Sequence, residues 1–338
     1  MTLKPPALQK GATVGIIAPA SPLPDPGYLE RGLDFWRQRG YRIRTGDHIN
    51  EVNGYLAGSD DRRLADLHRM FRDPEVQAIV CLRGGYGSLR LLAYLDYGLI
   101  AAHPKILVGY SDITALHLAI NKKTGLVTFH GPMIYPELGC QTPSPYTAES
   151  LLRTLTATEP PGPIPTAPGM PAAVTINPGQ ARGIVTGGNL SLVVATLGTP
   201  YEIDTRGKIL FLEEVDEAPY RLDRMLTQLH LAGKLYEAAG IVCGHCVGRT
   251  DPPRQAPGPA PATTNPSNPS PIWSQDLSPE AAAREVITAR LRPTGRPCFY
   301  GLPAGHITHQ VTLPLGIHAC LDAEACTLTY LETATAPA

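Results

Sequence analysis

The stretch ILVGYSDITALH, residues 106–117, decides the fold of this 338-residue chain. Its first residues are apolar and partly branched, which is typical of a buried strand, and a helical stretch begins at Thr114. A strand that passes through so short a turn into a helix is half of a β-α-β unit. The stretch therefore predicts a parallel sheet with crossover helices.

The same alternation of strand and helix extends in both directions from this stretch. The other elements that we expect in the N-terminal part are strands over 12–18, 41–45, 76–82 and 124–130 and helices over 28–39 and 59–71. Strands that alternate with helices indicate an α/β fold with a doubly wound parallel sheet.

Proline becomes frequent between residues 141 and 180, which indicates a boundary. We expect an N-terminal Rossmann-like domain over 1–140, a Pro-rich linker over 141–180 and a C-terminal mixed α/β domain over 181–335. The tract 251–271 is rich in Pro, Ala, Asn and Ser and predicts a flexible insertion. We expect the active site in the cleft between the two domains.

The second domain is predicted to contain both strands and helices, but its topology cannot be read from the sequence. The elements that we expect there are strands over 181–185, 208–213, 240–247 and 327–331 and helices over 190–197 and 220–232.

Composition excludes several classes of function. The 29 basic and 30 acidic residues nearly cancel without a long run of either sign, so we expect no nucleic-acid partner. No apolar run reaches the ~18 residues that a membrane span needs, so we expect no membrane partner. Seven cysteines at irregular spacings fit reduced thiols, which favours the cytoplasm.

Ser111 lies at the turn between the central strand and its helix. Such turns present a side chain at the carboxyl end of the sheet, where open α/β folds bind ligands. The N–H of Asp112 lies at a helix N-terminus, where it can stabilise an oxyanion. This pattern indicates a nucleophile, although a serine in this place is often only a helix N-cap, and the second Gly of G-x-S-x-G is missing.

A second glycine-rich turn, RGGYG over 83–87, follows the predicted strand over 76–82. Glycines let backbone N–H groups approach a bound group closely, as a second oxyanion donor must. A tight βα turn without any catalytic role also explains the glycines. Neither nucleotide-binding glycine motif, G-x-G-x-x-G nor G-x-x-x-x-G-K-[ST], is present.

These motifs belong to a longer series. The series consists of RGGYG at 83–87, GYSD at 109–112, GGNL at 187–190, LEE at 212–214, and GH at 305–306 followed by TLPLG at 312–316. In order and approximate spacing it resembles the LD-carboxypeptidase family of serine peptidases, which also includes enzymes that hydrolyse microcin C. The matches run from about residue 12 to residue 330, nearly the whole chain.

The resemblance implies a catalytic triad of Ser111 as nucleophile, Glu213 as carboxylate and His306 as general base. An imidazole can take the serine proton and return it to the leaving amine, while a carboxylate holds the ring in the right tautomer. Glu213 ends an apolar run, so we expect it at a strand end. Glu214 and His309 are the rivals for the second and third roles.

The two turns supply the amides of Gly85 and Asp112 as the expected oxyanion hole. The resemblance implies Arg83 and Asn189 as contacts to substrate, and Tyr86 is a further expected contact because its ring can line the pocket. Each contact has a structural alternative: Asn189 as a helix N-cap, Arg83 as a brace for its loop, and Tyr86 as a packing residue.

We expect neither a metal nor another cofactor. The sequence CGHC at 243–246 lacks the second pair of ligands that a zinc site needs, and two cysteines in an apolar strand are more often core thiols. His306 and His309 are spaced like a metal-ligand pair, but further ligands would be required.

The family resemblance implies a serine carboxypeptidase that releases terminal D-alanine from muropeptide tetrapeptides in peptidoglycan recycling. Its partner is then a small peptide substrate, and by analogy the protein forms a homodimer. Two alternatives remain: a microcin C-type immunity hydrolase that cleaves aminoacyl-nucleotide analogues, and a non-catalytic sensor that binds a muropeptide or nucleotide.

Overall fold

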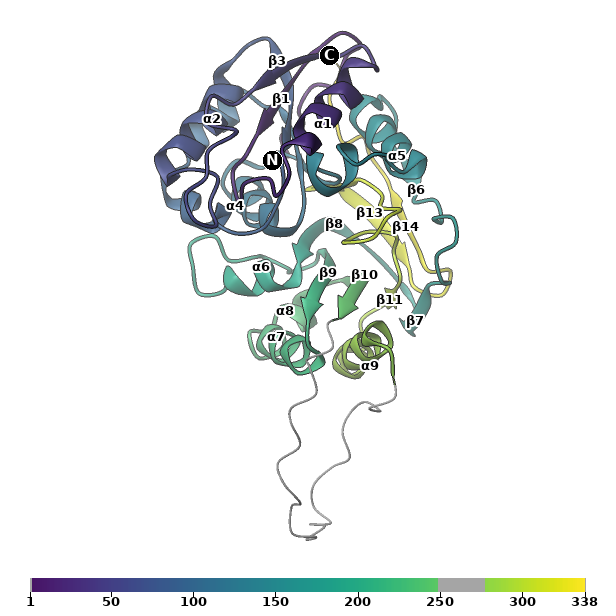
Figure 1. The fold of residues 1–338 in the computed structure, drawn as a ribbon. Helices are drawn as coiled ribbons and strands as arrows, with labels where there is room; N and C mark the ends of the chain where they lie inside the picture. Colours follow the sequence, from purple (N-terminus) through teal and green to yellow (C-terminus); the bar gives the residue numbers. More distant parts are fainter. Residues whose placement is uncertain (1, 249–276, 338) are drawn as a thin grey trace.

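Two sheets of mixed parallel and antiparallel strands organise the part of the chain that the computed structural model describes, residues 2–248 and 277–337. The N-terminal half supplies most of a six-stranded sheet, and the C-terminal half forms an eight-stranded sheet (Figure 1). The predicted α/β class is therefore confirmed. The insertion predicted over 251–271 lies outside the described residues.

The six-stranded sheet has the order β12-β5-β4-β3-β1-β2. Strands β1 to β5 run parallel, as predicted, whereas β12 pairs antiparallel with β5 and comes from the C-terminal part of the chain. No pattern in the sequence predicted this edge strand. The elements of this half are β1 (Thr13–Ile17), α1 (Gly27–Arg37), β2 (Arg42–Thr45), α2 (Asp60–Arg72), β3 (Val76–Cys81), α3 (Tyr97–Ala102), β4 (Ile106–Gly109), α4 (Thr114–Thr124), β5 (Thr128–His130) and β12 (Leu313–Leu315).

Helices cover both faces of this sheet (Figure 1). Alternate strand residues point to opposite faces. Val14 and Val80 pack in the same apolar cluster as the fully buried Trp36 of α1, while Ile79 packs with Leu67 of α2 on the other side. The sheet is thus doubly wound, as predicted.

Helix α2 shows how local sequence defines an element. The hydroxyl of Ser59 accepts a hydrogen bond from the backbone N–H of Arg62, so Ser59 is the N-cap. Asp60 and Asp61 lie in the first turn and Arg69 in the last turn, where their charges complement the helix dipole.

The eight-stranded sheet has the order β6-β14-β13-β8-β9-β10-β11-β7. Its four central strands, β8 to β11, are parallel, and antiparallel strands flank them. Helices α7 and α9 pack against one face (Figure 1). The elements are α5 (Pro145–Thr156), β6 (Gly162–Pro163), β7 (Val174–Asn177), β8 (Gln180–Asn189), α6 (Leu190–Ala195), β9 (Ile209–Glu217), α7 (Pro219–Leu231), α8 (Lys234–Glu237), β10 (Gly240–Gly248), α9 (Pro279–Leu291), β11 (Cys298–Tyr300), β13 (His318–Asp322) and β14 (Thr327–Tyr330).

The segment predicted as a Pro-rich linker, 141–180, contains ordered structure. Helix α5 begins after Ser144, whose hydroxyl accepts a hydrogen bond from Thr147 N–H, and its first residue is a proline. Proline is well tolerated there because the first N–H groups of a helix have no partner within it. Leu151 and Leu155 are fully buried in the core. The domain boundaries at 140 and 181 remain predictions.

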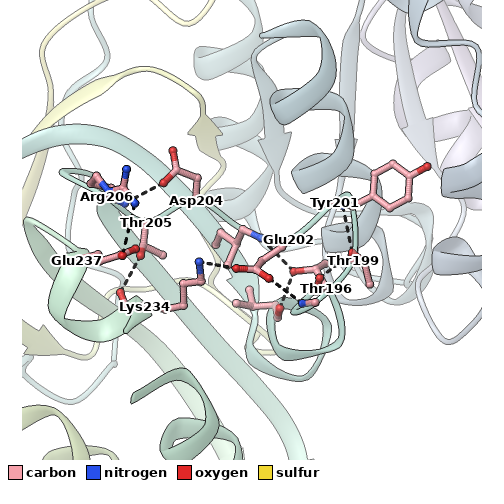
Figure 2. A network of polar contacts seen from close by, with 12 residues as sticks. Thr196, Thr199, Tyr201, Glu202, Asp204, Thr205, Arg206, Lys234 and Glu237 are labelled. Atoms are coloured by element: carbon pink, nitrogen blue, oxygen red, sulfur yellow. Dashed lines mark hydrogen bonds and ion pairs between the residues drawn. The ribbon is translucent and has the colours of Figure 1, made fainter. Parts of the chain in front are cut away.

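A network of polar contacts orders the connection between α6 and β9 (Figure 2). Lys234 forms an ion pair of 2.6 Å with Glu202, and the other Glu202 carboxylate oxygen accepts a hydrogen bond of 2.7 Å from Gly198 N–H. Lys122 of α4 donates to the Glu202 carbonyl at 2.8 Å. This last bond ties the connection to the six-stranded half of the molecule.

Among the described residues, every helix is too short or too polar to traverse a lipid bilayer.

We expect Gly187→Ala to destabilise the protein strongly. Gly187 has a φ of +129°, and a Cβ atom there would overlap the carbonyl oxygen of Phe211 in the paired strand β9. Backbone of two central strands cannot shift cheaply, so the free energy of unfolding should fall by about 3 kcal/mol or more. Urea denaturation measures this change.

The control is Gly198→Ala. Gly198 also has a positive φ, of +75°, but no atom lies within 4 Å of the place that a Cβ atom would take. Its cost should be only the intrinsic 1–2 kcal/mol, roughly, of a left-handed alanine. Equal losses in the two variants would contradict the argument from strand contact.

Candidate active site

Ser111 lies in a strained turn directly after β4. Tyr110 is extended, Ser111 has a φ of 60°, and a single 3-10 turn, Ser111–Ile113, leads into α4. A positive φ is uncommon for any residue other than glycine and is often found at functional sites. The N-cap positions of this turn and of α4 are Tyr110 and Ile113, so Ser111 is not the N-cap of either element.

The glycine-rich loop lies against the Ser111 turn. A Cβ atom on Gly84 would stand 2.9 Å from Ser111 Cβ and 3.3 Å from the backbone nitrogen of Asp112, so only glycine allows this approach. Ser88, just after the loop, donates from its hydroxyl to the Asp112 carbonyl at 2.5 Å and from its N–H to the Asp112 carboxylate at 2.8 Å. The loop and the turn are thus held together, and an oxyanion hole of Gly85 and Asp112 amides stays a prediction.

Glu213 and His306 form a hydrogen-bonded pair. Glu213 Oε2 and His306 Nδ1 are 2.8 Å apart, and the Glu213 side chain is fully buried. The pair joins residues that are 93 positions apart in the sequence. The expectation that Glu213 ends its strand is wrong, because β9 continues to Glu217 and the apolar run simply precedes two buried carboxylates.

Each member of this pair stabilises the charged form of the other. Burial alone raises the pKa of Glu213, but the attraction and hydrogen bond of His306 outweigh it and hold that pKa below its usual value. Burial likewise opposes protonation of His306, and the Glu213 carboxylate raises the pKa of the imidazole above its usual value. The arrangement favours a carboxylate that orients and supports an imidazolium.

The rivals of the two residues are engaged elsewhere. Glu214 accepts hydrogen bonds of 2.8 Å from the side-chain amide of Asn189 and from the backbone N–H of Ser191. His309 Nδ1 lies 2.8 Å from the hydroxyl of Ser144. Of the two glutamates and two histidines, only Glu213 and His306 contact each other by a hydrogen bond among the described residues.

Tyr110 links the serine turn to the histidine. Its ring centroid is 4.8 Å from that of His306, so the residue directly before Ser111 packs on the imidazole. No hydrogen bond joins the Ser111 hydroxyl to His306 in the described part of the chain. Catalytic hydrogen bonds are often long before substrate binds.

Glu137 and His130 also surround Tyr110, and no motif in the sequence predicted a role for either residue. The Tyr110 hydroxyl donates to Glu137 Oε1 at 2.6 Å. His130 lies behind the ring, with a centroid distance of 5.6 Å, and burial lowers the pKa of His130 to about 3, so this imidazole is neutral. Glu137 follows β5 and belongs to no recognisable motif. The only signal in the sequence that could have identified it is its place after a predicted strand.

A cavity of about 300 Å³ opens beside the pair. The residues that line it are Tyr110, Pro136, Glu137, Cys140, Thr142, Ser144, His306, Ile307 and Thr308. A small ligand in this cavity would meet the imidazole of His306 directly.

The three predicted substrate contacts have different surroundings. Arg83 donates to the carbonyl of Pro22 at 2.9 Å, which braces its loop. Tyr86 is 69 % exposed. Asn189 is buried and caps α6 by accepting a hydrogen bond from Leu192 N–H at 3.3 Å. Arg83 therefore braces its loop and Asn189 caps a helix, as their structural alternatives predicted. A contact of any of the three residues with substrate stays a prediction.

The cysteines of the CGHC segment lie in the core. Cys243 and Cys246 are buried in the cluster that α7 and α9 cover. Within residues 2–248 and 277–337, no group of three His, Cys, Asp or Glu side chains is arranged to hold a metal ion.

Comparison with protein families identifies two matching segments. The LD-carboxypeptidase N-terminal domain matches residues 14–131, and the LD-carboxypeptidase C-terminal domain matches residues 182–321. Ser111 lies in the first segment, and both Glu213 and His306 lie in the second.

Relatives match over nearly their full length. The chain is 44 % identical over 325 residues to the "Probable murein peptide carboxypeptidase" of Bacillus subtilis, covering 95 % of this chain and 92 % of the relative. It is 32 % identical to the murein tetrapeptide carboxypeptidase of Pseudomonas aeruginosa, covering 91 % and 92 %. It is 26 % identical to the microcin C7 self-immunity protein of Escherichia coli, covering 96 % of each.

Solved structures share the fold. The muramoyltetrapeptide carboxypeptidase from Oxalobacter formigenes superimposes with a TM-score of 0.76 at 28 % identity, covering 94 % of this chain and 97 % of that chain. The microcin C7 self-immunity protein in complex with aspartyl sulfamoyl adenosine gives a TM-score of 0.83 at 25 % identity, covering 99 % and 100 %. On these matches the chain belongs to the LD-carboxypeptidase family.

Proposed function

We propose that this protein is a serine-type LD-carboxypeptidase that hydrolyses the L,D-amide bond of muropeptide tetrapeptides and releases the terminal D-alanine. The observation that carries this proposal is the hydrogen bond between buried Glu213 and His306, whose ring packs beside the Ser111 turn. The curated relatives named as murein peptide and murein tetrapeptide carboxypeptidases support the substrate.

The proposed mechanism begins at the hydroxyl of Ser111. His306 Nδ1 is held by Glu213, so its Nε2 is the nitrogen left to take the serine proton as Ser111 attacks the scissile carbonyl. Glu213 stabilises the imidazolium that forms. Ser111 stands in a strained turn at the end of β4, and a turn of this kind presents a hydroxyl at the carboxyl end of the sheet.

The tetrahedral oxyanion would be held by the backbone amides of Gly85 and Asp112. Protonated His306 then gives its proton to the nitrogen of departing D-alanine as the amide bond breaks. A water molecule, deprotonated in turn by His306, hydrolyses the acyl-enzyme and regenerates the Ser111 hydroxyl.

The alternative substrate is an aminoacyl-nucleotide analogue, on which the same triad would act. The higher identity to carboxypeptidases, 44 % and 32 % against 26 % for the microcin C7 self-immunity protein, favours the muropeptide. Homodimer formation and a cytoplasmic location stay predictions.

Ser111→Ala should abolish release of D-alanine from a defined muropeptide tetrapeptide while leaving the thermal unfolding curve unchanged. The alanine removes the nucleophile, and residual catalysis should be lower by about 10⁴-fold or more. Mass spectrometry of free D-alanine measures the product. Parallel reactions with an aminoacyl sulfamoyl adenosine test the alternative substrate, and wild-type rates in Ser111→Ala would contradict the proposed nucleophile.

The dependence of kcat/KM on pH should reflect the pKa of His306 as the Glu213 carboxylate raises it. The general base must be neutral, so activity should rise with pH through the raised pKa of His306, with a midpoint above the usual value of about 6.5. Glu213→Gln removes the anion that raises this pKa. The midpoint should therefore move to lower pH, and the plateau rate should fall by about 10³- to 10⁴-fold.

Asp216→Asn is the matched control for that variant. Asp216 is exposed on the same strand as Glu213, and its positive φ of 57° suits asparagine. Its pH profile should coincide with that of the wild type. An acid limb that stays in place in Glu213→Gln would show that Glu213 is not the partner of the general base.

A further inference from the structure

Glu137 is a carboxyl group held in a fixed position at the edge of the site. It lies in the short helical turn Ile134–Leu138 that follows β5. One of its oxygens accepts from the Tyr110 hydroxyl at 2.6 Å, and the other accepts from Met133 N–H at 3.2 Å. Tyr110 itself is buried. The orientation of the Glu137 carboxyl is therefore fixed by two bonds before any ligand arrives.

No lysine or arginine forms an ion pair with Glu137 among the described residues. The charge of His306 favours the ionised form of Glu137, but His306 is already paired with Glu213. Burial raises the pKa of Glu137 to about 7, although Tyr110 and Met133 act in the opposite direction. Glu137 is partly buried, and a partly buried carboxylate without a cation beside it would bind a cation supplied by a ligand favourably.

Glu137 lines the cavity of about 300 Å³ that also contains His306. Apart from His306, the rest of the lining is hydroxyl, thiol and apolar, and no other acidic or basic side chain faces this space in the described structure. The cavity thus contains one carboxyl group that can bind a cation, and uncharged side chains line the rest of it beside the proposed general base.

Building on the proposed function, we propose that Glu137 binds an ammonium group carried by the side chain of the substrate residue that supplies the scissile carbonyl. In the muropeptide tetrapeptides that the family resemblance implies as substrates, that residue is a diamino acid. The departing D-alanine carries a carboxylate, which an ionised Glu137 would repel. A bound ammonium stabilises the ionised form of Glu137, whereas the carboxylate of D-alanine opposes it, so this cavity suits the diamino acid better than the leaving group.

The test compares Glu137→Gln with the wild type on acetyl-capped peptides that end in Lys-D-Ala or norleucine-D-Ala. Norleucine matches the lysine chain but has no ammonium. The glutamine oxygen can still accept from Met133 N–H, while its NH2 group can donate to the Tyr110 hydroxyl. For the lysine peptide, Glu137→Gln should lower kcat/KM by about 10- to 100-fold, the size expected for one charge-assisted hydrogen bond. Because Glu137 also helps to raise the pKa of His306, both peptides are assayed on the high-pH plateau, where kcat/KM for the norleucine peptide should be unchanged.

Glu149→Gln is the control, because Glu149 is an exposed carboxylate on α5 outside the cavity, and both peptides should react as with the wild type. An equal loss on both peptides in Glu137→Gln would overturn the proposal, because it would mean that Glu137 acts through His306. A norleucine peptide with a free N-terminal amine is the third substrate. A loss confined to it would assign the ammonium to the N-terminus and overturn the side-chain assignment.

The wild-type enzyme separates this proposal from the proposed function. Release of D-alanine from both capped peptides at equal rates, with no change in Glu137→Gln, would overturn the role of Glu137 and leave the carboxypeptidase activity intact. No release of D-alanine from any of the peptides would contradict the carboxypeptidase function itself.

Discussion

Burial of the Glu213 carboxylate is the constraint on which the rest of the site depends. A charged group removed from water is stable only with a partner of opposite charge or strong hydrogen-bond donors. Here the donor is His306, while the second oxygen of Glu213 has no protein partner in the described residues. The loop that carries His306 is therefore held against β9 by a bond whose loss would leave a bare charge in the core. Structure and proposed chemistry require the same contact.

Much of the fold could be predicted from local sequence. The strands over 76–82 and 106–109 and the helix from Thr114 are strongly apolar or follow short turns, and they lie where expected. Two features of the fold could not be predicted from local sequence. Strand β12 joins the six-stranded sheet from about 180 residues away, and no local pattern encodes such pairing. Helix α5 was hidden because its Ser-Pro start was counted as part of a Pro-rich linker.

The candidate site was predictable where a motif carried it. Ser111, Glu213 and His306 were found through a series of motifs, and the hydrogen bond between Glu213 and His306 agrees with that pairing. Local composition could not separate Asn189 as a helix cap from Asn189 as a substrate contact, because both uses favour asparagine before a helix. Glu137 was missed for a different reason. Its surroundings are made by Tyr110 and His306, which lie far away in the sequence.

The antiparallel pairing of β12 with β5 has a mechanical consequence for the imidazole. The loop that bears His306 leaves the eight-stranded sheet at β11 and enters the six-stranded sheet at β12, so its two ends are anchored in different sheets. Ser111 follows a strand of one sheet and Glu213 belongs to a strand of the other. Any rotation of one sheet against the other would strain the loop between β11 and β12. It would also change the position of His306 relative to Ser111.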